Sequence, residues 1–253
     1  MSQTVSRAME IMRFIGPSPR SLGEIADHIG VHKSTALRLL QTLEQDGFAR
    51  HLPDGRHTVG FAVIPLAQYA IDRIDIRTLA HPFLQRLAIE QGHTVHLAQL
   101  MGDDVIYVDK VDGSGTVAMG SRIGLPAEAH TAGVAKVVLA HLSEPAREEA
   151  IERLDFRRHT PTTIVTPGAF RRELDLVRQR GWAEDDGEKE DYINCVALPV
   201  FDASGRVTIG MSVTALRAVA PLTELREHMP EYRRVAQAIS RELGWNGDEH
   251  ARR

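Results

Sequence analysis

Residues 21–47, SLGEIADHIGVHKSTALRLLQTLEQDG, contain two helical patterns separated by a glycine. The first pattern starts with Ser21 and Glu24, the Ser-x-x-Glu spacing of a capping box, in which each side chain bonds an unpaired backbone N–H at a helix start. It stops at Gly30, which suits a tight turn, and the second pattern stops at Gly47. Two amphipathic helices joined by a short turn that contains glycine are typical of a helix-turn-helix motif.

The second of these helices is predicted to have one apolar and one polar face. At helical spacing the apolar face carries Ala36, Leu37, Leu40 and Leu43, and the opposite face carries Lys33, Ser34, Arg38, Gln41 and Gln45. Such a helix fits the DNA major groove, where arginine, serine and threonine read base edges and lysine and arginine neutralise phosphates. The pattern therefore favours DNA binding, and a helical module that contacts only protein is the alternative.

The flanks of this motif complete a small domain. Residues 5–15 form a further helical pattern, and residues 48–60, FARHLPDGRHTVG, predict a hairpin that turns at Pro53-Asp54-Gly55. A hairpin beside a recognition helix is typical of a wing, so residues 1–60 are predicted to form a winged helix-turn-helix. The residues expected to contact DNA are Arg7, Ser21, His32, Lys33, Ser34, Thr35, Arg38, Arg50 and Arg56.

Composition and charge narrow the class of protein. Of the 253 residues, 43% are hydrophobic and 25% are charged, which excludes a wholly disordered or fibrous chain. We expect no membrane span and no secretory signal, and the single cysteine, Cys195, fits a reducing cytoplasm. The net charge of −4 divides into +1 for residues 1–60, with seven basic and six acidic side chains, and −5 for the remainder. The acidic excess therefore belongs to the part that is not expected to contact DNA.

Beyond residue 60 the pattern changes. A helix over residues 61–80 is expected to link two domains, either as a dimer contact or packed on its own domain. Residues 81–253 are predicted to form an α+β domain, an antiparallel sheet with helices, large enough for a small-molecule pocket. The strands are expected at 94–100, 105–111, 116–119, 194–201 and 206–216, and the helices at 131–142, 143–154, 166–180 and 222–243.

Three segments, in the same order, resemble the IclR (isocitrate lyase regulator) family of transcription factors. The first is the winged motif, from SRAMEIMRFI at residues 6–15 to DGRHTVG at residues 54–60. The second comprises Arg122, Gly124, His130, Ala132, Gly133 and Lys136, and the third comprises Gly181, Trp182, Ala183, Asp185, Glu188, Cys195, Val196, Ala197, Pro199 and Val200. The chain departs from the family pattern at Glu128, Ala135 and Tyr192, where Pro, Gly and Gly are usual. These departures leave the ligand open.

The resemblance implies a winged helix-turn-helix joined by a linker helix to a GAF-like effector-binding domain. It implies a DNA-binding regulator, a repressor rather than an activator, whose operator binding is controlled by a small organic or aromatic acid or a related catabolic metabolite. The implied partners are double-stranded operator DNA and further copies of the chain, in a homodimer or a dimer of dimers. The expected effector-binding residues are Met119, Gly133, Val134, Asp185, Cys195, Ser212 and Thr214, with Leu125 and Trp182 as further candidates for apolar walls.

The chemistry of these residues suits a small ligand. Ser212 and Thr214 are two apart in an extended run, so both hydroxyls face one side of the sheet. Backbone N–H groups near residues 131–134, at a helix start, favour an anion. Asp185 would repel such an anion unless it is protonated or accepts a hydrogen bond from the ligand.

Two rival interpretations involve Cys195. An enzyme would use it as a nucleophile with His93, His96 or His130 as base and Asp185 as orienting group. A metal site would combine Cys195 with His93 and His96, but residues three apart on a strand point to opposite faces. The sequence therefore predicts no catalytic residues, no metal site and no cofactor.

Overall fold

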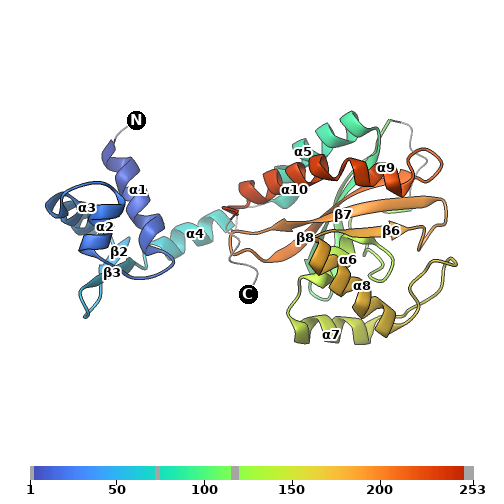
Figure 1. Cartoon of the computed structure of the whole chain (residues 1–253), viewed down its shortest axis with the longest axis horizontal. Helices are drawn as coiled ribbons and strands as arrows, with labels where there is room; N and C mark the ends of the chain where they lie inside the picture. The colour runs from blue at the N-terminus through green and yellow to red at the C-terminus, as the bar shows by residue number, and fades with distance from the viewer. Residues whose placement is uncertain (1–2, 72–74, 115–119, 248–253) are drawn as a thin grey trace. The chain divides into compact units, whose positions relative to one another are not determined.

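The computed structural model describes residues 3–71, 75–114 and 120–247. The chain divides into two compact units, Met1–Ile74 and Asp75–Arg253, called here the N-terminal and C-terminal units (Figure 1). The expected linker region, residues 61–80, contains helix α4 (Val63–Ile71) and the start of α5 (Ile76–Gln91). The predicted boundaries at residues 60 and 80, which separate the DNA-binding domain, the linker and the effector-binding domain, stay predictions. Within the described residues, no helix is both long and apolar enough to cross a bilayer.

Three helices pack around a small apolar core in the N-terminal unit. They are α1 (Gln3–Ile15), α2 (Leu22–His28) and α3 (Lys33–Gln45). The capping box forms as predicted: Ser21 Oγ accepts a hydrogen bond from Glu24 N (3.3 Å), and Glu24 Oε2 accepts one from Ser21 N (2.8 Å). The core contains the fully buried side chains of Ile11, Ile15, Ile25, Ala36 and Leu40.

The wing follows α3. Strands β2 (Ala49–His51) and β3 (Arg56–Val59) form the predicted hairpin, and β1 (Arg20–Ser21) adds to it in the antiparallel order β1-β3-β2. Strand β1 is not predictable from local pattern, because two residues show no periodicity. The helix-turn-helix with its hairpin is confirmed.

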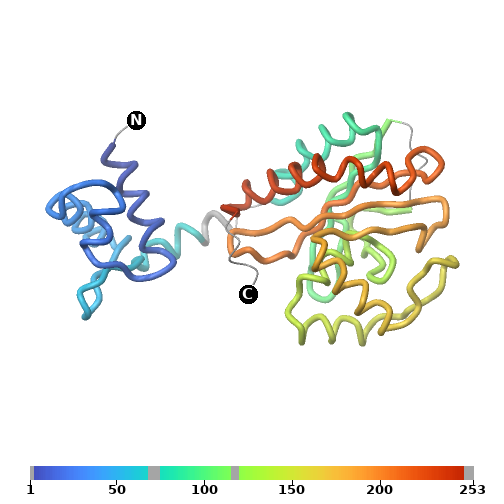
Figure 2. The backbone as a smooth tube through the Cα atoms, viewed as in Figure 1, coloured from blue at the N-terminus to red at the C-terminus, as the bar shows by residue number. Residues whose placement is uncertain are grey.

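Five antiparallel strands form the sheet of the C-terminal unit, in the order β5-β4-β8-β7-β6. Strand β4 pairs with β8, so that Thr94 lies opposite Thr214 and His96 opposite Ser212. Strands β4 and β8 are far apart in the sequence and lie side by side in the fold, as the backbone view of Figure 2 shows. The strands are β4 (Thr94–Met101), β5 (Asp104–Val111), β6 (Ala183–Asp186), β7 (Ile193–Phe201) and β8 (Val207–Leu216).

Helices cover both faces of this sheet (Figure 1). One face is covered by α5, α9 (Leu222–Glu227) and α10 (Met229–Glu242), and its core includes Leu84, Met211 and Tyr232. On the other face α6 (Gly133–Ala140) packs on the strands, and α7 (Glu144–Arg153) and α8 (Pro167–Arg180) pack on α6, with Phe170 and Leu174 in the core. Because side chains alternate along β7 and β8, Cys195, Ser212 and Thr214 face the α6 side. The predicted α+β architecture is confirmed.

The structure corrects two details. The expected helix at 222–243 is two helices, because Pro230 starts α10 and the chain turns at His228. Strand β6 was not expected, since its sequence, AEDD, is poor in strand-forming residues. Pro82 lies inside the continuous helix α5. The strand expected at 116–119 falls outside the described residues.

Candidate DNA-reading surface and effector cavity

Helix α3 presents a polar face to solvent. His32, Lys33, Ser34 and Arg38 are exposed and Thr35 is half-buried. Leu37, which the helical spacing places on the apolar face, is 38% exposed. The side chains of Leu39 and Leu43 pack against the core instead, together with the buried Ala36 and Leu40. The buried stripe is therefore rotated slightly from the expected one, because Leu39 takes the place of Leu37.

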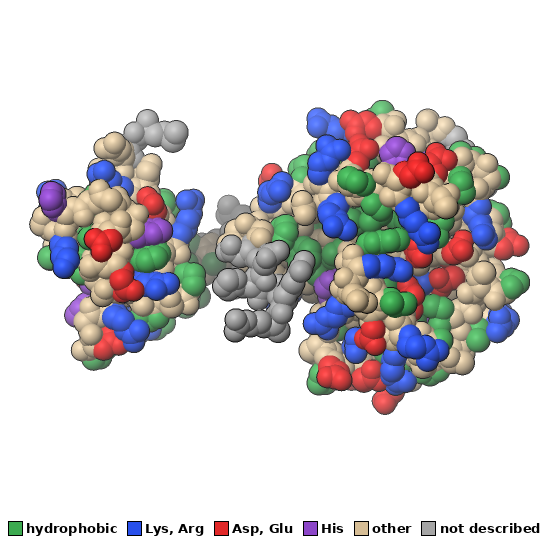
Figure 3. Space-filling model, in the orientation of Figure 1, with side chains coloured by type: hydrophobic (Ala, Val, Ile, Leu, Met, Phe, Trp, Pro, Cys, Tyr) green, Lys and Arg blue, Asp and Glu red, His purple; other side chains and the backbone are tan. Residues whose placement is uncertain are grey.

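The remaining candidate DNA contacts lie on other elements. Arg7, on α1, is half-buried, and the hydroxyl of Ser21 is engaged in the capping box. Arg50 stacks its guanidinium 4.7 Å above the Phe61 ring. Arg56 donates from Nε and Nη2 to Asp54 Oδ2 (2.9 and 2.6 Å), which offsets part of its charge at the wing tip. In the view of Figure 3, basic side chains of this unit are interspersed with acidic ones and form no single block.

A partly buried pair, His57 and Glu44, connects the wing to α3. His57, on β3, is 5% exposed, and its Nδ1 lies 2.8 Å from Glu44 Oε1 near the end of α3. The pair joins the two elements expected to touch DNA. Sequence reasoning did not find this pair, because the two residues meet only through the packing of β3 on α3.

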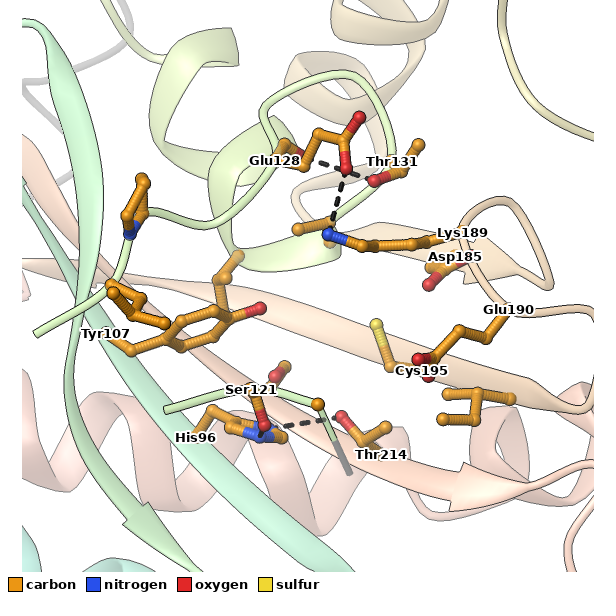
Figure 4. Close-up of a pocket in the computed structure, with 18 of the residues that line it drawn as sticks. His96, Tyr107, Ser121, Glu128, Thr131, Asp185, Lys189, Glu190, Cys195 and Thr214 are labelled. Carbon is orange, nitrogen blue, oxygen red and sulfur yellow. Dashed lines mark hydrogen bonds and ion pairs between the residues drawn. The ribbon is translucent and has the colours of Figure 1, made fainter. Parts of the chain in front are cut away.

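A cavity of about 210 Å³ lies between the sheet and the start of α6. Figure 4 shows side chains from several strands and loops around it. Six of the seven expected effector residues line it, and the seventh, Met119, lies outside the described residues. The six are Gly133, Val134, Asp185, Cys195, Ser212 and Thr214. The lining also includes residues that were not among the expected effector contacts: His96, Tyr107, Ser121, Arg122, Glu128, Thr131, Lys189, Glu190 and Ile193.

Strands β4 and β8 supply an uncharged polar wall. His96 Nδ1 lies 3.3 Å from Thr214 Oγ1, and its Nε2 lies 2.7 Å from Ser121 Oγ (Figure 4). Burial lowers the pKa of His96 to about 4, and the nearby positive charge of Lys110 adds to this effect. The imidazole is therefore neutral at pH 7, so this wall provides hydrogen bonds and no charge.

The start of α6 forms a second wall beside Cys195. Ala132 caps this helix without a side-chain hydrogen bond, so the helix start depends on other groups for its unpaired N–H donors. A Cβ atom on Gly133 would lie 2.9 Å from Cys195 Sγ, so glycine is required for this close approach. Burial raises the pKa of Cys195 to about 12, and Asp185 adds to the effect. A buried neutral thiol is a poor nucleophile.

Buried charges lie at one end of the cavity. Burial raises the pKa of Asp185 to about 6, although Asp185 Oδ1 accepts a hydrogen bond from Glu188 N (2.7 Å). Lys136 is fully buried and donates from Nζ to Glu188 Oε1 and to the Glu184 carbonyl (2.9 Å). The cavity therefore adjoins the carboxyl group of Asp185, whose pKa is raised. Asp185 accepts its hydrogen bond from the backbone of Glu188, which is itself held by the buried ion pair with Lys136.

The rim of the cavity carries both signs of charge. Lys189 Nζ lies 2.9 Å from Glu128 Oε2, and Arg122 and Glu190 line the same opening. Glu128 occupies a position where the resembling family has proline, and this departure was the sequence signal available for the rim. Lys189 gave no such signal.

The two further candidates for apolar walls, Leu125 and Trp182, lie in different places. Leu125 lines the cavity, whereas Trp182 packs against the core of the other sheet face, with the Arg180 guanidinium 4.5 Å from its ring. The bases considered for Cys195 also have other partners: His96 bonds Ser121 and Thr214, and His130 Nε2 bonds the Arg157 carbonyl (3.0 Å).

The sequence is similar to known proteins over both units. The family model described as the IclR helix-turn-helix domain matches residues 4–53, and that described as the bacterial transcriptional regulator IclR C-terminal domain matches residues 68–241. The HTH-type transcriptional regulator XynR of Escherichia coli is 30% identical over 246 residues, 96% of this chain and 98% of XynR.

Two further proteins are similar. The transcriptional repressor IclR of Escherichia coli is 30% identical over 205 residues, 79% of this chain and 75% of the repressor. The crystal structure of Thermotoga maritima IclR superposes with a TM-score of 0.64 at 32% identity and covers 96% of this chain and 99% of that one.

Proposed function

The chain belongs to the IclR family of bacterial DNA-binding transcriptional regulators, and we propose that it is a repressor released from its operator by a small organic acid. This family consists of regulators rather than enzymes, which rejects the interpretation of Cys195 as a catalytic nucleophile. The regulator would act in the cytoplasm, where its operator lies.

The observation that carries the proposal is a cavity lined by polar and apolar side chains in the C-terminal unit, which contains no part of the helix-turn-helix. Its volume of about 210 Å³ lies below the roughly 300–1,000 Å³ of pockets for drug-sized ligands. A metabolite with a few carbon atoms therefore fits better than a large aromatic compound. Two similar proteins are named as repressors, the transcriptional repressor IclR of Escherichia coli and the acetate operon repressor of Salmonella typhimurium, which supports repression as the sign of regulation.

The charges around the cavity narrow the ligand further. The start of α6 favours a carboxylate, because the first N–H groups of a helix carry partial positive charge. Ser212, Thr214 and His96 offer hydrogen bonds to a hydroxyl or carbonyl group. Asp185 tolerates an anion when protonated and otherwise accepts a hydrogen bond from a ligand hydroxyl. A small hydroxy or keto acid satisfies all three walls.

A homodimer or a dimer of dimers is part of the proposal. Phe61, Ile64 and Leu66, at and before the start of α4, are 67%, 62% and 53% exposed. Exposed apolar side chains grouped on one segment are typical of a protein contact. Two copies joined there would offer two recognition helices to a near-palindromic site.

The experiment is a mobility-shift titration of the full chain with DNA from upstream of its own operon. Specific binding that weakens with salt and is reversed by one small hydroxy or keto acid is the expected result. The acid is found first by a thermal-shift screen of small carboxylates. Absence of sequence-specific binding, with and without every acid that shifts the melting temperature, would overturn the proposal.

A further inference from the structure

Three nitrogen and oxygen donors meet beside the cavity, and of these three residues Glu128 lines it. They belong to Glu128, His130 and His159, and one donor atom from each lies within 4.8 Å of the other two. Glu128 Oε1 lies 2.5 Å from His159 Nε2 and 3.9 Å from His130 Nε2. Glu128 also lines the cavity, as Figure 4 shows, so the group adjoins the space assigned to the effector.

The fold holds the two histidines in place. The side chain of His130 is 1% exposed and packs its ring against Phe156 and His159, with centroids 5.5 and 6.0 Å away. The backbone N–H of His159 donates to Thr163 Oγ1 (3.1 Å), and the Thr163 hydroxyl donates to the Glu188 carbonyl (2.6 Å). The loop that carries His159 is therefore fixed to the segment that carries Glu188 and Lys189.

The third donor is ionised. Burial alone would raise the pKa of Glu128, but hydrogen bonds from Lys189 and His159 outweigh it, so its pKa lies below the usual value. A carboxylate with two imidazoles is the donor set of many zinc sites that keep one position open for water or another ligand. This donor set contains no thiolate, so it also accepts other divalent transition metals.

We propose that Glu128, His130 and His159 bind a divalent transition metal of the Zn²⁺ class, with one coordination position open toward the cavity. The structure requires only a small adjustment. At metal–ligand distances of about 2.0–2.2 Å, tetrahedral donors lie roughly 3.3–3.5 Å apart. The Glu128–His159 pair must therefore separate by about 1 Å, and His130 must turn from the Arg157 carbonyl. A neutral imidazole binds a metal through the ring nitrogen that carries no proton, so the single N–H proton of His130 moves from Nε2 to Nδ1.

The sequence did not predict this site. The metal site weighed there combined His93 and His96 with Cys195, and no metal was predicted. The proposed site depends on Glu128, which stands where the family usually has proline. The open position gives the metal a second role, which depends on the proposed function: it would hold a carboxylate of the effector.

The first test is metal binding by the full-length chain after chelator treatment. Titration with Co²⁺, followed by its visible absorption, and with Zn²⁺, followed by calorimetry, should give one site per chain. Glu128→Gln and His159→Gln should each weaken binding at least tenfold. His228→Gln is the matched control, because His228 forms a comparable pair with Glu231 (4.0 Å) away from the cavity, and it should bind like the wild type.

A variant in the opposite direction separates metal binding from general destabilisation. Lys189 occupies Glu128 Oε2, so Lys189→Met should strengthen metal binding by freeing this oxygen. Melting curves recorded with chelator show whether each variant is folded. No binding tighter than about 100 µM in wild type, or equal binding by wild type and His159→Gln, would overturn the site.

The open position has its own test. Acetate added to the Co²⁺-loaded protein should shift the absorption bands, because it would enter the coordination sphere from the cavity. Unchanged bands would contradict the open position. Because this experiment needs neither DNA nor the natural effector, its failure is distinguishable from failure of the repressor proposal.

Discussion

The candidate DNA-reading surface and the cavity of the C-terminal unit place their functional residues in opposite environments. Lys33 and Arg38 on α3 are exposed, whereas Lys136, Asp185 and Cys195 around the cavity are buried. Burial shifts the pKa values of Asp185 and Cys195, to about 6 and about 12. The reading surface should therefore tolerate substitution without loss of fold. Substitution of a buried residue around the cavity is expected to change both ligand binding and the stability of the fold.

The largest effect is expected from Lys136→Met. This substitution leaves Glu188 buried without its cation, and breaking a buried pair costs about 3–5 kcal/mol. Urea unfolding followed by tryptophan fluorescence measures it, because both tryptophans, Trp182 and Trp245, lie in the C-terminal unit. Lys136→Met combined with Glu188→Met should recover most of the loss. If Lys136→Met is as stable as the wild type, the buried ion pair does not contribute to stability and the contrast between the buried and exposed residues fails.

Arg38→Ala tests the exposed side of the comparison. We expect operator affinity to fall by about 1–3 kcal/mol, roughly ten- to a hundredfold, with ligand affinity and unfolding unchanged. Mobility shift and calorimetry on the same preparation measure both. Arg206→Ala, which removes an equally exposed charge from the C-terminal unit, is the control and should keep its DNA affinity. Equal loss of DNA and ligand binding would indicate misfolding instead.

Ser212→Ala combined with Thr214→Val tests the uncharged wall. Each lost hydrogen bond is worth about 0.5–1.5 kcal/mol, so effector affinity should fall about tenfold while DNA affinity is kept. Thr208→Val is the matched control, since Thr208 lies on the same strand but is not among the residues that line the cavity. An unchanged dissociation constant in calorimetry would remove Ser212 and Thr214 from the ligand site.

The smallest effect concerns pH. Burial raises the pKa of Asp185 to about 6, so the group is increasingly ionised between pH 5 and 7. An anionic effector should therefore bind more weakly as pH rises through about 6, by less than tenfold. Asp185→Asn should remove this part of the pH dependence, as measured by calorimetry with an acid that is fully ionised over the range. The same slope in both proteins would assign the effect to another group.

The raised pKa of Asp185 also affects stability. An acid whose pKa is higher in the folded protein than in the unfolded chain stabilises the fold at low pH. This contribution is present below about 4 and is lost as pH rises through about 6.

Local patterns predicted most of the fold. The Ser21–Glu24 capping box and the αL glycines at Gly92 and Gly181 set helix ends within a few residues, so short windows were sufficient. Alternation located four of the five strands of the larger sheet. It missed β6, because three of its four residues are acidic; one of them, Asp185, is buried and accepts a hydrogen bond from Glu188 N.

The cavity was predicted less completely than the fold. Ser212 and Thr214 follow from alternation within one strand, and Gly133, Asp185 and Cys195 came from the family resemblance. His96 meets Thr214 only because β4 pairs with β8, and no local pattern contains that pairing. The rim residues Glu128 and Lys189 meet through loops, so their ion pair depends on tertiary structure.

The pairing of β4 with β8 also has a consequence for synthesis on the ribosome. Thr94 meets Thr214 across this pair, so the central part of the sheet cannot form until nearly the whole chain has emerged. The helix-turn-helix, whose contacts are local, can fold long before that point. A nascent chain would therefore carry a folded DNA-reading unit while its sensor is still incomplete, and a ribosome stalled before residue 207 would release a chain that lacks β8 and the effector-side wall it provides.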